Sequence, residues 1–150
     1  MPMPFSIHQL GPADLQYAQE LIALFQTAFE EDAAPLPPAN YLHTLLARPD
    51  FHAFVALNQN QVLGGVTAYE LPMFQRPVSE MFLYDIAVAE PQRARGVAAA
   101  LIEALKALCR QRGIESLFVG TETDNVPALR LYKATGGVAD EHIAWFNYSV

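Results

Sequence analysis

Residues 80–98 read EMFLYDIAVAEPQRARGVA, and this stretch contains the features that decide the fold. Its first part, Glu80 to Val88, is apolar almost throughout, which predicts a strand covered on both faces. A long helix rich in alanine and leucine is predicted from Arg95 to Arg112, and Gly113 stands where a left-handed residue ends such a helix. A buried strand leading directly into a long helix is typical of a sheet with helices packed against it.

The other predicted elements give the order β-α-α-β-β-β-α-β-α-β along the chain. The turn residues Asn58-Gln59-Asn60-Gln61 predict a hairpin, whereas the later alternation of strands and helices implies parallel pairing, so the sheet should be mixed. Strands are expected at Phe5 to Leu10, Phe51 to Leu57, Val62 to Leu71, Ser116 to Thr121 and His142 to Tyr148. Helices are expected from the opening residues Gly11 to Asp14 to the acidic end Glu30 to Asp32, from about Ala39 to Ala47 and from about Val126 to Thr135.

Length and composition predict one globular domain, residues 1–150. Hydrophobic residues make up 52% of the chain and charged residues 17%, which is enough apolar material for a buried core. The 16 acidic and 9 basic residues give a net charge of −7. This charge argues against nucleic acid or an anionic membrane as the main partner, because both require a basic surface.

Targeting signals are not apparent in the sequence. The single cysteine excludes an internal disulfide and fits a reducing compartment. Residues 1–5 have neither the basic nor the apolar stretch of a signal peptide, and the apolar runs are too short for a spanning helix. We therefore expect a cytoplasmic protein.

The strongest local motif is R-x-x-G-x-A, formed by Arg93, Gly96 and Ala98. Small residues at a helix start allow a ligand to approach the backbone, and the N–H groups of the first turn then favour an anion. The motif thus predicts a phosphate or pyrophosphate site, to which Arg93 and Arg95 would add charge. Taken alone it is weak evidence, because glycine is common near the starts of helices.

A second motif, N-x-x-A-x-x-L-Y followed by a glycine, runs from Asn125 to Tyr132 with Gly136. Together with R-x-x-G-x-A and the element order, it resembles the GCN5-related N-acetyltransferase (GNAT) superfamily over essentially the whole chain. The resemblance implies an α/β fold with a central mixed sheet of six to seven strands and about four helices. It also implies acetyl coenzyme A as co-substrate, lying across splayed middle strands, and no metal.

Two further stretches resemble the type I aminoglycoside 3-N-acetyltransferases: L-P-x-F at Leu71 to Phe74, and S-E-M-F-L-Y-D-I-A-V at Ser79 to Val88. Tyr41-Leu42 and the leucines that follow add to this likeness. It implies direct acetyl transfer to the 3-amino group of a gentamicin-type antibiotic, and thereby resistance. The alternatives are acetylation of another polycation such as a polyamine, acetylation of a protein amine, and a coenzyme A-binding module without catalysis.

Asp85 is the first candidate for catalysis, because it interrupts an otherwise apolar strand. A carboxylate there is costly unless it is paired or solvated, and holding and deprotonating a cationic amine would explain it. Capping of backbone N–H groups or pairing with an arginine is the structural alternative. Glu122 is the second candidate for the base.

Tyr132 falls where the superfamily places a tyrosine beside the coenzyme A sulfur, so the resemblance implies that its phenol assists the leaving thiolate. Asn125 would by resemblance bond the pantetheine arm, although it can equally be a helix N-cap. The backbone of Ile86 to Val88 would pair with the pantetheine amides. The full set of expected coenzyme A contacts is Ile86, Ala87, Val88, Arg93, Arg95, Gly96, Val97, Ala98, Ala99, Asn125 and Tyr132.

The expected substrate-binding residues are acidic: Glu31, Glu80, Asp85, Glu122 and Asp124. For Glu31 the alternative is a solvated helix end, because it lies in the acidic run 30–32. Cys109 has the helical spacing of a core residue, and the four histidines lack metal-ligand spacing. We expect a homodimer with a cationic small molecule as substrate, and the strand-forming residues 145–148 are a candidate interface.

Overall fold

The computed structural model describes residues 4–32 and 34–150, and the chain forms two compact units, residues 1–120 and 121–150. Part of the stretch on which the signal-peptide expectation rests, residues 1–3, lies outside the described residues. The expectation of one domain over residues 1–150 stays a prediction.

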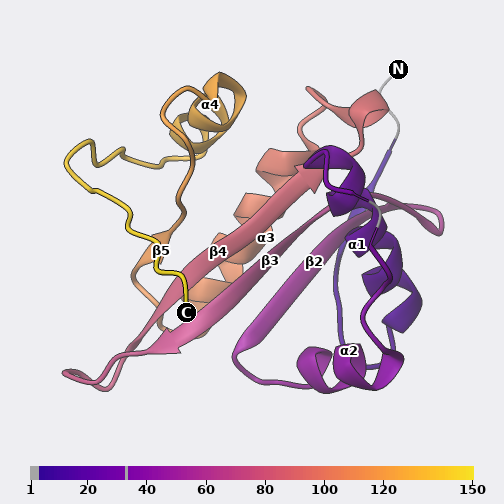
Figure 1. The fold of residues 1–150 in the computed structure, drawn as a ribbon, viewed down its shortest axis with the longest axis horizontal. Coiled ribbons are helices and arrows are strands. Elements are labelled where there is room, and N and C mark those ends of the chain that lie inside the picture. Colours follow the sequence, from indigo (N-terminus) through magenta and orange to yellow (C-terminus); the bar gives the residue numbers. More distant parts are fainter. Residues whose placement is uncertain (1–3, 33) are drawn as a thin grey trace. The chain divides into compact units, whose positions relative to one another are not determined.

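A five-stranded mixed sheet forms the centre of the first unit, with the strands in the order β1-β2-β3-β4-β5 (Figure 1). The strands β1 to β4 pair antiparallel, whereas β4 and β5 are parallel. The predicted mixed α/β class is confirmed, although the sheet formed by the described residues has five strands and not six or seven. The strands are β1 (Ser6–Gln9), β2 (Phe51–Asn58), β3 (Gln61–Pro72), β4 (Ser79–Val88) and β5 (Leu117–Phe118).

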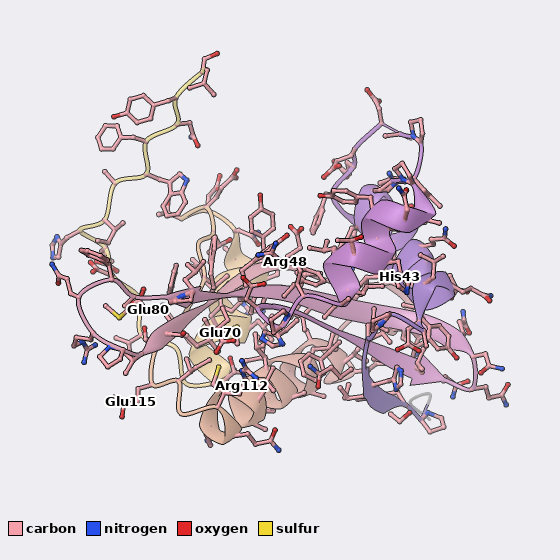
Figure 2. All side chains as sticks on the ribbon, turned by 90° about the horizontal axis from the view of Figure 1, so that it is seen from below. His43, Arg48, Glu70, Glu80, Arg112 and Glu115 are labelled. Atoms are coloured by element: carbon pink, nitrogen blue, oxygen red, sulfur yellow. The ribbon has the colours of Figure 1, made fainter. Side chains whose placement is uncertain are left out.

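Helices cover both faces of this sheet. In the view of Figure 2, α1 (Leu15–Ala28) and α2 (Ala39–Leu46) lie above the sheet, and α3 (Val97–Gln111) lies below it. A short 3-10 helix, Glu90–Gln92, connects β4 to α3. The first unit is therefore a three-layer arrangement, as the alternation of strands and helices predicts.

The contact between α1 and the sheet depends on a glycine. A Cβ atom built on Gly65 of β3 would lie 2.4 Å from a methyl group of Leu21, which is 2% exposed. Leu21 therefore packs directly on the strand backbone, within a cluster of buried apolar residues from α1, α2, β2 and β3. This packing fixes α1 over the middle of the sheet.

Alternation along β3 identifies the residues that face α3. Glu70 bonds Arg112 just beyond the end of α3, so Ala68 and Val66 share its face, and both are fully buried. From the helix, Leu101 and Leu105 are fully buried as well. Cys109 is also buried, as its helical spacing predicts.

Two predicted boundaries in the first unit are corrected by local geometry. The helix α3 begins at Val97 and not at Arg95, because Gly96 has the left-handed φ of 81° and cannot continue a right-handed helix. The predicted strand Ser116 to Thr121 is reduced to Leu117–Phe118, because only these residues pair with β4.

The second unit contains one helix, α4 (Val126–Ala134), followed by an extended chain. The predicted strand His142 to Tyr148 is not formed in this unit, all of whose residues are described. Its sequence has strand character, but a strand exists only where its backbone pairs in a ladder, and these residues have no ladder partner. This missing strand accounts in part for the smaller sheet.

Candidate functional site

A β-bulge in β4 determines the direction of Asp85. Opposite β3, Thr67 pairs with Asp85 and Ala68 with Leu83, so Tyr84 is an extra residue without a partner. In a regular strand Tyr84 and Asp85 would point to opposite faces, yet both line the same cavity. The bulge therefore turns Asp85 toward the face that α1 and α2 cover.

This cavity has a volume of about 170 Å³ and lies between the sheet and the helices α1 and α2. Its walls are mainly apolar, and Asp85 contributes the carboxyl group among the residues that line it. Side chains lining it include Leu21, Phe25, Leu45, Phe51, Thr67 and Tyr69. The cavity thus presents one carboxylate in an apolar surface, the arrangement that orients a small cationic ligand.

The carboxylate of Asp85 is half-buried and accepts no hydrogen bond within the described residues. Burial is the main cause that raises its pKa above the usual value for aspartate, and the negative charge of Glu31 raises it further. A higher pKa makes a carboxylate a better proton acceptor near neutral pH. Asp85 can therefore bind an ammonium ion and also receive its proton.

Two of the predicted substrate acids of the first unit behave differently. Glu31, just after α1, lies close enough to Asp85 to affect its pKa, so the two acids share one region. Glu80 lies near the beginning of β4, five residues before Asp85, which at strand spacing is roughly 15 Å away. The structure therefore brings Glu31 within electrostatic reach of Asp85, although Glu31 does not line the cavity, and it leaves Glu80 apart.

Aromatic side chains line the cavity together with Asp85, and sequence reasoning missed them. The ring of Tyr69 lies 5.6 Å from that of Tyr84 and 5.2 Å from that of Phe51, measured between centroids. Phe82 contacts Tyr84 on the other side, at 5.6 Å. The sequence does contain aromatic residues in three successive strands. Whether they lie on the same face of the sheet depends on the strand register and on the bulge, which the sequence does not show.

Beyond Phe82, β4 has an open edge within the described part of the first unit, because β5 pairs only with Met81 and Phe82. The N–H of Ala89 donates to the carbonyl of Leu63 in β3. The carbonyl of Val88 does not pair with β3 and accepts a hydrogen bond from Nε of Arg93 at 3.1 Å. Alternation of the ladder therefore turns the backbone groups of Ile86 and Val88 to the open edge and those of Ala87 toward β3. A peptide-like ligand could pair with this edge.

The beginning of α3 has the features of an anion site. Its first internal hydrogen bond joins the N–H of Ala100 to the carbonyl of Gly96, and no side chain caps the helix. The N–H groups of Val97, Ala98 and Ala99 thus have no acceptor within the helix. A Cβ on Gly96 would meet nothing within 4 Å, so the space above this turn is open.

The two arginines of the motif differ in their roles. Arg93 donates a hydrogen bond to the carbonyl of Val88, which links the segment preceding α3 to the end of β4. Arg95 is exposed beside the first turn of α3. The side chain of Val97 is buried, so its contribution to a ligand would be its N–H group.

Four predicted site residues belong to the second unit. The side chain of Asn125 accepts a hydrogen bond from the N–H of Ala128 at 3.2 Å, which makes it the N-cap of α4. Glu122 and Asp124 are exposed in the turn before it. Burial raises the pKa of the Tyr132 phenol, which therefore keeps its proton at neutral pH and can donate it.

The α3 face of the sheet holds a buried polar cluster that the sequence did not reveal. Glu70 is 9% exposed and accepts hydrogen bonds from Nε of Arg112 at 3.1 and 3.2 Å and from Nη2 at 2.6 Å; Figure 2 labels both residues. His52 is also buried, with its Nε2 atom 3.6 Å from Glu70. Burial lowers the pKa of His52, so this histidine is neutral at pH 7. The cluster fixes the end of α3 to β2 and β3.

Neither a metal site nor a membrane span is found in the described part of the chain. In residues 4–32 and 34–150, no three His, Cys, Asp or Glu side chains are grouped to bind a metal ion. The helices of these residues are too short or too polar to cross a bilayer.

Comparison with known proteins gives one family. The model of the acetyltransferase (GNAT) family matches residues 18–136. The aminoglycoside acetyltransferase HMB0005, from an uncultured soil metagenomic sample, is 37% identical with a TM-score of 0.92 over 99% of each chain. A second from such a sample, meta-AAC0020 in complex with sisomicin, is 30% identical with a TM-score of 0.92, covering 97% of this chain and 96% of that one. YycN, an uncharacterized N-acetyltransferase of Bacillus subtilis (strain 168), is 31% identical over 80% of this chain and 78% of its own.

Proposed function

The chain belongs to the acetyltransferase (GNAT) family, and from this premise we propose that it acetylates the 3-amino group of a gentamicin-type aminoglycoside. The observation that carries the proposal is Asp85, a carboxylate half-buried in a cavity, which accepts no hydrogen bond from residues 4–32 and 34–150 and whose pKa is raised by burial and further by Glu31. A cationic amine is the ligand that offsets such a charge. The likeness to two aminoglycoside acetyltransferases supports the same class of substrate.

GNAT acetyltransferases use acetyl coenzyme A, and the open residues of the first unit fit this co-substrate. The uncapped N–H groups at the start of α3 fit its pyrophosphate, with Arg95 adding positive charge. The backbone groups of Ile86 and the N–H of Val88 at the open edge of β4 fit the amides of its pantetheine arm. Arg93, which bonds Val88, would position these two regions relative to each other.

The reaction is direct transfer of the acetyl group to a neutral amine. Acetyl coenzyme A supplies the acetyl group as a thioester, an activated acyl donor. Asp85 binds the substrate as its ammonium form, orients it and receives a proton from it, directly or through a water. Backbone N–H groups of the middle strands would stabilise the negative charge that develops on the carbonyl oxygen.

We assign two further roles by resemblance. Tyr132 retains its proton at neutral pH and would donate it to the leaving thiolate. Because a thiolate leaves readily, this contribution is expected to be smaller than that of Asp85. Glu122 and Asp124 are exposed acids that would add negative charge for a polycationic substrate. Acetylation removes a positive charge from the antibiotic, and we propose that it confers resistance.

The cellular setting follows from the same proposal. The net charge of −7 suits a cationic small molecule and not nucleic acid or an anionic membrane. We propose that the protein acts in the cytoplasm, where acetyl coenzyme A is present, as a homodimer. Gel filtration with light scattering, on the chain with and without residues 145–148, tests that assembly.

A thiol-release assay with gentamicin and spermidine side by side tests the proposed activity. We expect acetyl coenzyme A-dependent release with gentamicin, little with spermidine, and an acetylated 3-amino group in the product by NMR. Release with spermidine alone would keep the transferase and replace the substrate by a polyamine. Release with neither, despite coenzyme A binding, would contradict the proposal in favour of a protein amine or a module without catalysis.

A further inference from the structure

Two tyrosines on the side of the sheet that bears Asp85, one in β4 and one in α2, are largely exposed. Tyr84, the extra residue of the bulge, is 59% exposed and lines the cavity. Tyr41 on α2 is 59% exposed as well, and it precedes the cavity residue Leu45 by one helical turn, on the same side of the helix. Burial is the main cause that raises the pKa of Tyr69, and the charge of an ionised Tyr41 raises it further, so Tyr41 lies within electrostatic reach of Tyr69.

The ring of Tyr84 is held in place before any ligand arrives. It makes T-shaped contacts with Tyr69 and Phe82, with interplanar angles of 74° and 68°. A ring already fixed by its neighbours loses little conformational entropy when it binds a ligand. The exposed part of Tyr84 is thus a rigid apolar surface beside the carboxylate of Asp85.

Exposed tyrosine rings favour one class of amine over another. A saturated ring presents a flat set of C–H groups that can pack on an aromatic side chain, and it is already rigid. A linear amine offers less flat surface and must freeze several bonds on binding. Carboxylates alone would not distinguish the two, because both carry the same ammonium group.

We propose that Tyr84 and Tyr41 form a platform for the saturated ring of the acceptor, while Asp85 and Glu31 hold its ammonium group. The site then selects amines borne on a ring, such as amino sugars and aminocyclitols, over linear amines. This proposal rests on the proposed function, because it assigns a substrate class to the same cavity. Tyr84 acts as a binding residue that sets specificity and has no part in proton transfer.

The test compares two diamines with the same N–C–C–C–N spacing: 2-deoxystreptamine, an aminocyclitol, and linear 1,3-diaminopropane. NMR titration of the full chain should give a lower Kd for the cyclic amine in the wild type. Tyr84→Leu and Tyr41→Leu should each weaken binding of the cyclic amine about three- to tenfold. Binding of the linear amine should change by less than about twofold, whereas Asp85→Asn should weaken both.

Tyr84→Phe is the matched control, because it keeps the ring and removes only the hydroxyl. It should bind both amines as the wild type does, and it separates stacking from any chemistry of the phenol. Tyr41→Leu changes an exposed helix residue, so it serves if Tyr84→Leu proves unstable by its Tm. The same protein is assayed for turnover of sisomicin, which tests the proposed function separately.

Some outcomes would overturn the proposal. Equal affinity of the wild type for the two diamines, including no binding of either, would contradict a ring platform. So would a preference for the ring that persists in both leucine variants. If the preference behaves as expected but sisomicin is not acetylated, the platform stands and the aminoglycoside assignment fails.

Discussion

Asp85 and Glu70 are carboxylates on neighbouring strands, but they face opposite layers of the first unit. Glu70 lies under α3 and accepts close hydrogen bonds from Arg112. Asp85 lies under α1 and α2, and within the described residues its carboxylate accepts none. Glu70 has Arg112 and His52 beside it, whereas Asp85 lies among mainly apolar side chains, so the comparison shows what a polar partner contributes.

The difference shows how a structural acid can be told from a functional one. Removing a carboxylate from water costs several kcal/mol, and a bidentate arginine offsets that cost for Glu70 within the fold. For Asp85, no arginine among the described residues of the first unit offsets the free energy of removing its carboxylate from water, so we expect a cationic ligand to do so. The comparison therefore predicts that Glu70 affects stability and that Asp85 affects turnover.

The largest expected effect is that of Asp85→Asn on catalysis. Asparagine keeps the shape but cannot bind the ammonium charge or accept its proton, so kcat/KM for gentamicin should fall about tenfold to a thousandfold. The Tm should stay the same or rise, because the pKa of Asp85 is raised by burial and its charge at neutral pH is therefore unfavourable to folding. Steady-state kinetics and a melting curve on the same sample measure both.

The activity losses of two variants in the second unit can be compared with that of Asp85→Asn. Tyr132→Phe should reduce turnover less than Asp85→Asn, and a larger loss would mean that protonation of the thiolate dominates. If Asp85→Asn retains full activity while Glu122→Gln abolishes it, the base has been assigned to the wrong residue.

The next effect concerns stability and comes from Arg112→Met. This change leaves Glu70 buried without its partner and should lower the free energy of unfolding by about 2–3 kcal/mol. The estimate is at the low end for broken buried pairs because the Arg112 side chain is 40% exposed. Urea unfolding measures the loss, and activity per folded molecule should hold within about twofold.

The double variant Glu70→Gln with Arg112→Met provides the control for this pair. Removing both charges should recover most of the lost stability, because no uncompensated charge remains. A double variant as unstable as Arg112→Met alone would mean that the aliphatic part of Arg112, and not its charge, supports the end of α3.

The sequence predicted the paired and the unpaired acid with unequal success. Asp85 stood out because a single charge in an apolar strand is visible locally. Glu70 was not recognised, because its partner lies 42 residues away and only the packing of α3 on β3 brings them together. A sequence pattern reveals a charged residue in an apolar strand, but it does not reveal a partner residue that is distant in the sequence.

The same reasoning explains which parts of the fold were predicted. Helix α3 and strands β2 to β4 depend on strong periodicity within each segment, and they form close to the predicted boundaries. The bulge at Tyr84 and the short β5 depend on pairing between strands, which the residues of one strand do not reveal. Residues 142–148 have strand propensity without a ladder partner, so propensity alone predicted them wrongly.

His52 gives a smaller effect, which appears as a pH dependence of stability. Because burial lowers its pKa in the folded state, the unfolded chain takes up a proton below about pH 6.5 that the folded protein does not. The contribution of neutral His52 to the free energy of unfolding is fully present above pH 6.5. It is lost as the pH falls toward the pKa of His52 in the folded protein, by at most about 1.4 kcal/mol per pH unit. In urea unfolding at pH 7.5 and 5.5, His52→Phe should flatten this decline. The exposed His43→Gln is the control and should keep it (Figure 2).

The smallest effect tests the influence of Glu31 on Asp85. Asp85 must be ionised to hold the ammonium, so kcat/KM should rise as the pH passes the raised pKa of Asp85. Glu31 is the second cause of that increase, after burial, so Glu31→Gln should move the acid limb of the pH profile to lower pH. Glu30→Gln removes the neighbouring charge and should leave the limb in place. An acid limb that is identical in Glu31→Gln would attribute the raised pKa to burial alone. If the acid limb persists in Asp85→Asn, it reports the titration of another group. The comparison with Glu70 would then no longer support a catalytic role for Asp85.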